Sequence, residues 1–149
     1  AMLQGARHEH AEALLNASKE LGIEVKVIEL RKSSQINSDI SALILPGGES
    51  TAMRKASESE SLLDGIFNWM NDFPQRPVLG TCAGAILLAN PSEKFEAFVN
   101  AEISRNAWGR QRQSFQAPLE VNLETPSGRK TEGRRYSMDH VHPNPPKAE

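Results

Sequence analysis

The chain has 149 residues, 17 Lys and Arg against 19 Asp and Glu, and a formal net charge of −2. This length predicts one compact domain and is too short for two of ordinary size, and the near-neutral charge gives no reason to expect a nucleic-acid or membrane-surface partner. With no apolar run near the ~20 residues of a membrane span, no leader pattern and a single cysteine that cannot form an internal disulfide, we expect a cytoplasmic protein.

The first half of the chain alternates between helical and strand-like patterns. Residues 8–21 carry apolar side chains at helical spacing and Gly22 ends the pattern, which predicts a helix. Residues 23–30 are rich in β-branched side chains and predict a buried strand. The short apolar run 42–45, followed by Pro46-Gly47-Gly48, is typical of a parallel strand covered on both faces.

The middle of the chain continues the alternation. Ser61 is the expected N-cap of a helix, and the apolar stripe of that helix is formed by Leu62, Leu63, Ile66, Phe67 and Met70. Residues 77–80 predict a strand and residues 83–89 the helix that follows it. Strands alternating with helices predict a doubly wound, flavodoxin-like α/β sheet with helices on both faces, a three-layer sandwich.

Both ends depart from that pattern. Only Ala1-Met2-Leu3 precede Gln4, too few for a full central strand. Residues 115–123 alternate strictly and predict a half-exposed antiparallel strand. The last 25 residues hold four prolines and eight charged side chains, which predicts mostly loop or tail. We therefore expect a domain over residues 1–123, shortened at its first strand and in its C-terminal half, and an irregular segment over residues 124–149.

The sharpest chemical pattern is Gly80-Thr81-Cys82-Ala83-Gly84, placed between a predicted strand and a predicted helix. It has the form of a nucleophile elbow, in which glycines permit a tight turn and the nucleophile stands at the start of a helix. The helix N-terminus favours a thiolate, and the Ala83 N–H would face a developing oxyanion. A buried structural cysteine between packing glycines is the alternative.

A second glycine loop follows the predicted strand 42–45. Gly47 and Gly48, with Glu49 and Ser50 after them, would stand where open α/β sheets bind ligands, and paired glycines let the backbone approach a substrate. The alternative is a simple strand-to-helix turn in which Glu49 and Ser50 begin the helix.

These blocks, in their order, resemble the glutamine amidotransferase subunit of pyridoxal 5′-phosphate synthase, a class I triad glutaminase, over about residues 4–121. The resemblance rests on the segments 4–6, 9–10, 45–51, 80–84 and 105–111. It implies that Cys82 attacks the side-chain amide of L-glutamine. It also implies that the glutamine is held by Gly48, Glu49 and Ser50, with the glycine loop helping to build the oxyanion hole. Arg105 matches a further glutamine-binding position, and its fork suits a carboxylate.

The resemblance also implies a histidine base within a late His-Pro-Glu motif. His142-Pro143 match its first two positions, and Asn144 stands where the glutamate belongs. Asparagine can still accept a hydrogen bond from an imidazole N–H, so His142 is the candidate base; the alternative is a histidine without a role in a tail. His8 and His10, on the predicted first helix, are expected to serve surface or partner contacts.

Three functions remain open at this point. The first is an active glutaminase that passes ammonia to a (β/α)₈-barrel synthase subunit making pyridoxal 5′-phosphate. The second is a catalytically impaired relative that acts as a non-enzymatic docking or regulatory subunit, which Asn144 and the short C-terminal half favour. The third is a cysteine hydrolase or redox protein with the same elbow, which the loops at 46–51 and 105–111 disfavour. No metal and no organic cofactor is expected.

Overall fold

The structure, a computed structural model, describes residues 2–3, 7–103, 115–121 and 134–141. The chain divides into two compact units, Ala1–Ile103 and Ser104–Glu149. The domain boundary expected after residue 123 stays a prediction.

A parallel four-stranded sheet forms the centre of the first unit. Its strands are β1 (Met2–Leu3), β2 (Glu29–Leu30), β3 (Leu43–Leu45) and β4 (Val78–Gly80), in the order β2-β1-β3-β4. Each neighbouring pair is parallel. The chain thus winds outward from β1 in both directions, which confirms the predicted doubly wound α/β fold.

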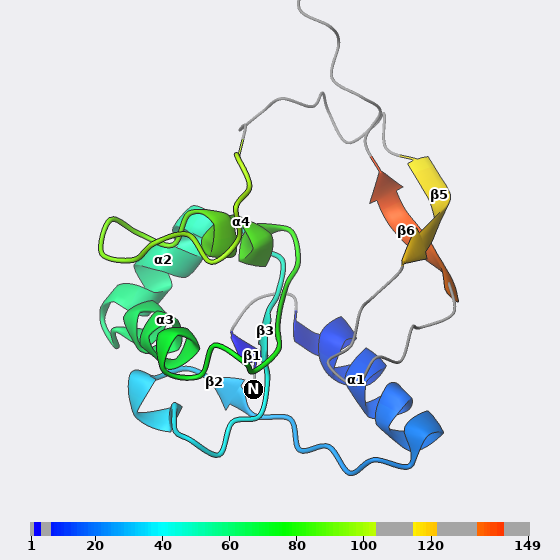
Figure 1. Cartoon of the computed structure of the whole chain (residues 1–149), viewed down its shortest axis with the longest axis horizontal. Coiled ribbons are helices and arrows are strands. Elements are labelled where there is room, and N and C mark those ends of the chain that lie inside the picture. Colours follow the sequence, from blue (N-terminus) through cyan, green and yellow to red (C-terminus); the bar gives the residue numbers. More distant parts are fainter. Residues whose placement is uncertain (1, 4–6, 104–114, 122–133, 142–149) are drawn as a thin grey trace, which may run out of the picture. The chain divides into compact units, whose positions relative to one another are not determined.

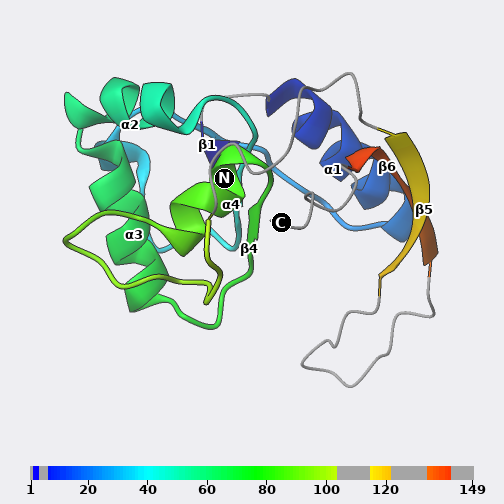
Figure 2. The same cartoon turned by 90° about the horizontal axis from the view of Figure 1, so that it is seen from above.

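In the described part of this unit, four α-helices cover the two sides of the sheet. Figures 1 and 2 show α1 (Arg7–Leu21) on one side, and α2 (Ser50–Glu58), α3 (Leu62–Asp72) and α4 (Ala83–Ala89) on the other. Because the strands are parallel, the segments that leave β1, β3 and β4 all start from the same edge of the sheet.

The hydrophobic core lies between the sheet and α3 and α4. The apolar stripe predicted for α3 is buried throughout, and Phe67 in its centre is 1% exposed. The Phe67 ring packs edge-on against Phe95, with 5.2 Å between the ring centroids, and at a tilt against Phe98, with 5.6 Å between them. Leu87 of α4 is fully buried in the same cluster. This packing fixes α4, whose bounds are those predicted, against β3 and β4.

Helix α1 is attached more loosely than the other helices. None of its residues is buried, and its inward side is a half-buried stripe that consists of Arg7, His10, Ala11, Leu14 and Ser18. The helix ends as predicted at Gly22, which adopts φ 64°, a left-handed conformation that glycine takes without a steric penalty.

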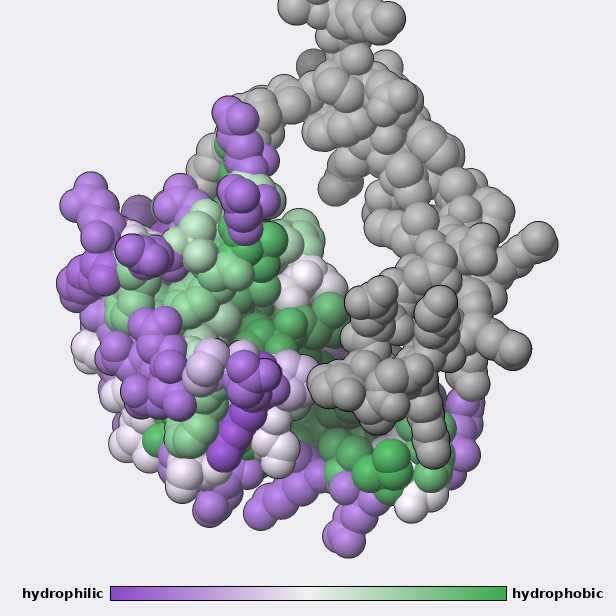
Figure 3. Space-filling view, in the orientation of Figure 1, coloured by the Kyte–Doolittle hydropathy of each residue, from purple (hydrophilic) through white to green (hydrophobic). Residues whose placement is uncertain are grey.

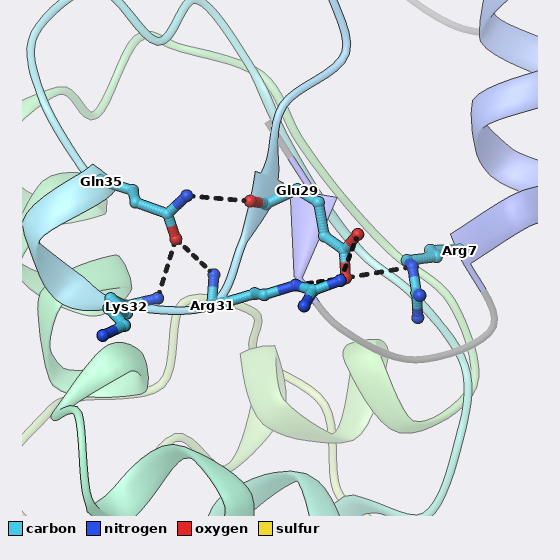
Figure 4. A network of polar contacts seen from close by, with 5 residues as sticks. All are labelled: Arg7, Glu29, Arg31, Lys32 and Gln35. Carbon is cyan, nitrogen blue, oxygen red and sulfur yellow. Dashed lines mark hydrogen bonds and ion pairs between the residues drawn. The ribbon is translucent and has the colours of Figure 1, made fainter.

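A polar network ties the start of α1 to β2 (Figure 4). The Glu29 carboxylate pairs with Arg7 Nε at 3.1 Å and with Arg31 Nε at 3.2 Å. The hydrogen bond from Arg31, with the charges of Arg31 and Arg7 beside it, lowers the pKa of Glu29. The Gln35 amide accepts from the backbone N–H groups of Arg31 and Lys32 and donates to the Glu29 carbonyl, which holds the 3₁₀ turn η1 (Ser33–Gln35) on β2.

One local prediction in this unit is wrong, and a second, Ser61 as the N-cap residue of α3, is confirmed in position but not in its side-chain bond. The strand expected over residues 23–30 is confined to Glu29–Leu30, and Ile23 is 58% exposed. A strand persists only where a partner supplies hydrogen bonds, and the described part of β1 offers two residues, Met2 and Leu3. Ser61 does precede α3, but at φ 47° its side chain makes no capping bond; its N–H instead donates to the Glu58 carbonyl and closes the turn from α2.

The described surface of this unit is mixed. Hydrophilic residues line the outer side of α2 and α3 in Figure 3. Large apolar side chains are also exposed, at Leu15, Leu21, Ile23, Leu79, Val99 and Ile103. None of the helices in the described ranges combines the length and the apolar character that crossing a bilayer requires.

The second unit contains an antiparallel pair of strands, β5 (Phe115–Val121) and β6 (Arg134–Val141). Their register pairs Phe115 with Val141 and Val121 with Arg134. The antiparallel strand expected near residues 115–123 is confirmed. Within residues 125–149, expected to be mostly loop or tail, residues 134–141 instead form β6 by pairing with β5, a partner strand that the composition of this segment alone does not reveal.

Candidate active site

Cys82 lies on the turn between β4 and α4 in a backbone conformation that is rare for a residue with a side chain. Its φ is 50° and its ψ is −111°. Such a conformation costs on the order of 1–3 kcal/mol and is typical of the strained strand-to-helix turn of a nucleophile elbow. Cys82 is exposed and its thiol is free. The alternative of a buried structural cysteine is therefore excluded.

The two glycines of the elbow are required by packing. A Cβ on Gly84 would lie 1.8 Å from the Leu45 carbonyl oxygen, and a Cβ on Gly80 would lie 2.7 Å from Leu88 Cδ1. The first turn of α4 thus rests directly on the end of β3, at a distance that a side chain would prevent. This confirms the steric reason for which the sequence pattern requires glycine at both positions.

The glycine loop after β3 meets the elbow after β4. Leu45 and Gly80 are paired in the sheet, and the Thr81 N–H donates to the Leu45 carbonyl at 3.0 Å. A Cβ built on Gly47 would lie 3.4 Å from the Cβ of Cys82. The prediction that the two loops share one edge of the sheet is confirmed, and the backbone of Gly47 lies directly beside the cysteine.

Glu49 has a structural role in this loop. Its carboxylate accepts from the N–H groups of Thr51 at 2.9 Å and Ala52 at 2.5 Å, and so caps the N-terminus of α2. Ser50, the first residue of α2, is 5% exposed. The alternative, in which Glu49 and Ser50 begin the helix, is therefore confirmed: the Glu49 side chain caps α2 and Ser50 is its first residue. Contacts of Glu49 and Ser50 with a substrate stay a prediction.

Sequence reasoning missed a contact between the first helix and the elbow. His10 Nε2 of α1 lies 2.9 Å from Thr81 Oγ1, although the two residues are 71 positions apart. The expectation that His10 serves a surface or partner contact is wrong. The edge rule for parallel sheets could have found it, since the first turns of α1 follow β1 and begin at the edge where the two loops lie.

The remaining predicted site residues are placed in part. Ala83 is 1% exposed, and as the first residue of α4 its N–H has no acceptor within the helix. Arg105, His142 and Asn144 lie outside the described residues, so their relation to Cys82 stays a prediction. Within the described ranges no three His, Cys, Asp or Glu side chains gather closely enough to hold a metal ion.

This protein has the features of the α/β proteins with a cysteine nucleophile elbow. These features are the doubly wound sheet and an exposed cysteine on a strained turn beside a glycine loop. Residues 1–127 match the model of the SNO glutamine amidotransferase family. The chain belongs to this family, which confirms the resemblance drawn from its motifs.

Individual relatives agree with this assignment. The pyridoxal 5′-phosphate synthase subunit PdxT of Pyrococcus furiosus is 39% identical over 128 residues, covering 82% of this chain and 64% of the relative. PdxT of Pyrobaculum aerophilum is 41% identical over 133 residues, covering 82% and 62%. A solved glutamine amidotransferase structure is 38% identical, with a TM-score of 0.60, and is matched over 81% of this chain and 64% of its own. This chain thus spans just under two thirds of the length of these proteins.

Proposed function

We propose that this chain is a glutaminase, which hydrolyses L-glutamine to glutamate and ammonia through a thioester on Cys82. The observation that carries the proposal is the geometry of the elbow. Cys82 is exposed on a strained turn at the start of α4, and the backbone of Gly47 lies beside it. Membership of a glutamine amidotransferase family supports glutamine as the substrate over other amides.

The proposed reaction has two steps. The Cys82 sulfur attacks the side-chain carbonyl carbon of glutamine, the carbon–nitrogen bond breaks, and ammonia leaves with the proton that the thiol gave up. Water then attacks the γ-glutamyl thioester, which releases glutamate and restores the thiol. His142 is the proposed base that moves these protons, and Asn144 is proposed to accept from its imidazole.

Each carbonyl attack develops negative charge on oxygen. The N–H of Ala83 and the amides of the Gly47-Gly48 loop are the proposed donors to that oxygen, because both come from the edge of the sheet at which Cys82 lies. Gly48 has φ 149°, a conformation that residues with side chains rarely adopt, so the loop keeps its backbone accessible. Glu49, Ser50 and Arg105 are proposed to hold the rest of the glutamine.

We further propose that the ammonia passes to a separate (β/α)₈-barrel subunit that makes pyridoxal 5′-phosphate. The support is that the relatives are subunits of pyridoxal 5′-phosphate synthase. The cytoplasm is the proposed location, because thiols are kept reduced there and the sequence has one cysteine, which cannot form an internal disulfide.

Glutamate release by the full 149-residue chain, measured with and without the synthase subunit, tests this function. We expect release that rises when the subunit is added and that falls by at least about 10³-fold in Cys82→Ala and Cys82→Ser. Lys55→Ala, on the exposed side of α2, is the matched control and should release glutamate normally.

Two outcomes contradict the proposal. Release that persists in Cys82→Ala would place the nucleophile elsewhere. No release by the unmodified chain with its synthase subunit would mean that this chain is not a glutaminase.

A further inference from the structure

The residue before the nucleophile is held by three hydrogen bonds that lead to three different elements. The Thr81 N–H donates to the Leu45 carbonyl of β3 at 3.0 Å, and the Thr81 carbonyl accepts from the Gly84 N–H of α4 at 2.9 Å. The Thr81 hydroxyl is joined to His10 Nε2 of α1 at 2.9 Å. The first two bonds are made by the backbone and are independent of the side chain at position 81, whereas the third depends on both side chains.

The bond to His10 links the elbow to the helix on the other side of the sheet. His10 lies on the half-buried stripe of α1, one turn after Arg7, which pairs with Glu29. These two contacts hold the N-terminal end of a helix that has no buried residue. Because the bond is half-buried, water competes with it less than it would at an exposed position.

The turn that this bond supports is strained. A residue other than glycine keeps a φ near 50° only where its surroundings over-determine the conformation. Cys82 is such a residue, and the peptide before it belongs to Thr81. If the turn relaxed, the peptide between Thr81 and Cys82 would rotate and Cys82 would move away from Gly47. Fixing the side chain of Thr81 restricts that rotation.

We infer that His10 is a positioning residue for the glutaminase reaction, which acts through the Thr81 hydroxyl to keep Cys82 in the attacking position. This inference rests on the proposed function. His10 moves no proton of the substrate in this role; its imidazole serves as a hydrogen-bonding group of fixed length. A glutamine side chain places an amide nitrogen at a similar distance from its Cα and would serve in the same way.

The test uses paired variants of the full chain, assayed for glutamine hydrolysis with the synthase subunit present. His10→Ala and Thr81→Val each remove one partner and should lower kcat by about 3- to 10-fold with KM unchanged. The double variant should lose no more than either single variant, because both remove the same bond. His10→Gln and Thr81→Ser should restore most of the rate. His8→Ala, on the exposed side of the same helix, is the matched control.

A second measurement does not depend on activity. Hydrogen exchange of the peptide that spans residues 79–88 should become about 3- to 10-fold faster in His10→Ala and in Thr81→Val, the same factor as the expected fall in kcat. It should remain unchanged in His8→Ala. Exchange across the core helix α3 should not change. This separates loosening of the elbow from unfolding of the whole unit.

Several results would overturn the inference. An unchanged kcat in His10→Ala, an effect confined to KM, additive losses in the double variant, or unchanged exchange over residues 79–88 each contradicts positioning through Thr81. Failure of His10→Gln to restore the rate would contradict a role that needs only a hydrogen-bonding group at this position. If the unmodified chain releases no glutamate, the proposed function fails, and the exchange measurement alone decides whether His10 holds the elbow.

Discussion

Replacing Gly84 by alanine adds one methyl group at the place where α4 touches β3. The added Cβ would lie 1.8 Å from the Leu45 carbonyl oxygen and 2.5 Å from its carbon, far inside the 3.0 Å below which Cβ atoms essentially never approach another heavy atom. Both atoms belong to the backbone of a buried strand, so no side chain can rotate away to make room. Helix α4 must therefore shift away from the sheet.

Two opposing contributions set the size of the effect. Alanine favours a helix over glycine by about 1 kcal/mol, which stabilises the variant. Overpacking costs about 1–3 kcal/mol and more where the surroundings cannot yield, and here the neighbour is backbone. Taking the overpacking cost at about 3–4 kcal/mol for this backbone contact, less the roughly 1 kcal/mol gained in the helix, we expect a net loss of about 2–3 kcal/mol in the free energy of unfolding, equivalent to a fall of roughly 10 °C in Tm for a unit of this size.

Thermal and urea unfolding of the Gly84→Ala chain measure this loss. Gly22→Ala is the matched control, because Gly22 also stands at a helix end but has nothing within 4 Å of the position that an added methyl group would take. It should lose only the roughly 1–2 kcal/mol that a left-handed conformation costs a residue with a side chain. A Gly84→Ala chain as stable as the unmodified one would refute the claim that α4 rests on the Leu45 carbonyl.

Three further predictions concern the loop, the core and the pH dependence. In Gly47→Ala the new Cβ would lie 3.4 Å from the Cβ of Cys82. The free energy of unfolding should therefore change by less than about 1 kcal/mol, while glutamate release should fall by more than about tenfold. A normal rate of release would contradict a functional role for this close approach of Gly47 to Cys82. Phe67→Ala, at a fully buried aromatic position, should cost about 3–5 kcal/mol in urea unfolding, and a loss below about 1 kcal/mol would contradict a core centred there. The pKa of Glu29 is lowered, first by the hydrogen bond from Arg31. This pairing stabilises the folded chain at pH values above the ordinary pKa of 4.5, and that stability is lost as the pH falls through the folded-state pKa. Glu29→Gln should therefore flatten the decline of stability in acid, and an unchanged pH profile would show that this pairing has no energetic effect.

Helices α1, α3 and α4 and the elbow could be predicted because their patterns are local, whereas α2 was expected only as the alternative for the glycine loop. The buried stripe around Phe67 repeats at helical spacing, and the glycines at 80 and 84 mark the tight turn in the local sequence, although the atom that excludes a side chain at 84 is the distant Leu45 carbonyl oxygen. Helix α4 accordingly begins and ends where the pattern placed it. The strand expected over residues 23–30 failed for the opposite reason: its extent depends on the length of a partner strand that lies elsewhere in the chain.

Much of the candidate site depends on contacts between distant segments. The Gly47 and Cys82 loops could be brought together by reasoning, because consecutive parallel strands deliver their carboxyl ends to one edge. The contact of His10 with Thr81 has no local pattern, since a histidine on a helix gives no sign of its partner, and only the same edge rule, applied to the start of α1, could have indicated it. Glu49 caps the N-terminus of α2. The sequence offered a helix start at this residue only as the alternative to a ligand-binding loop, because its position in a motif does not reveal which N–H groups its carboxylate binds.

The strained turn at Cys82 is fixed at both of its ends, and this links the stability of the unit to the chemistry of the site. Before the cysteine, Thr81 is bonded to three elements. After it, α4 is fixed by the burial of Leu87 in the core and by Arg54 of α2, whose guanidinium donates to the carbonyls of Asn90 and Pro91 beyond the end of the helix. Because the turn cannot relax unless one end is released, a substitution that loosens α4 should alter the position of the cysteine as well as the stability of the unit. Loss of the proposed glutaminase activity in a core variant is therefore expected without any change to a residue proposed to contact the substrate, whereas substitutions on the exposed side of α1 should leave both properties intact.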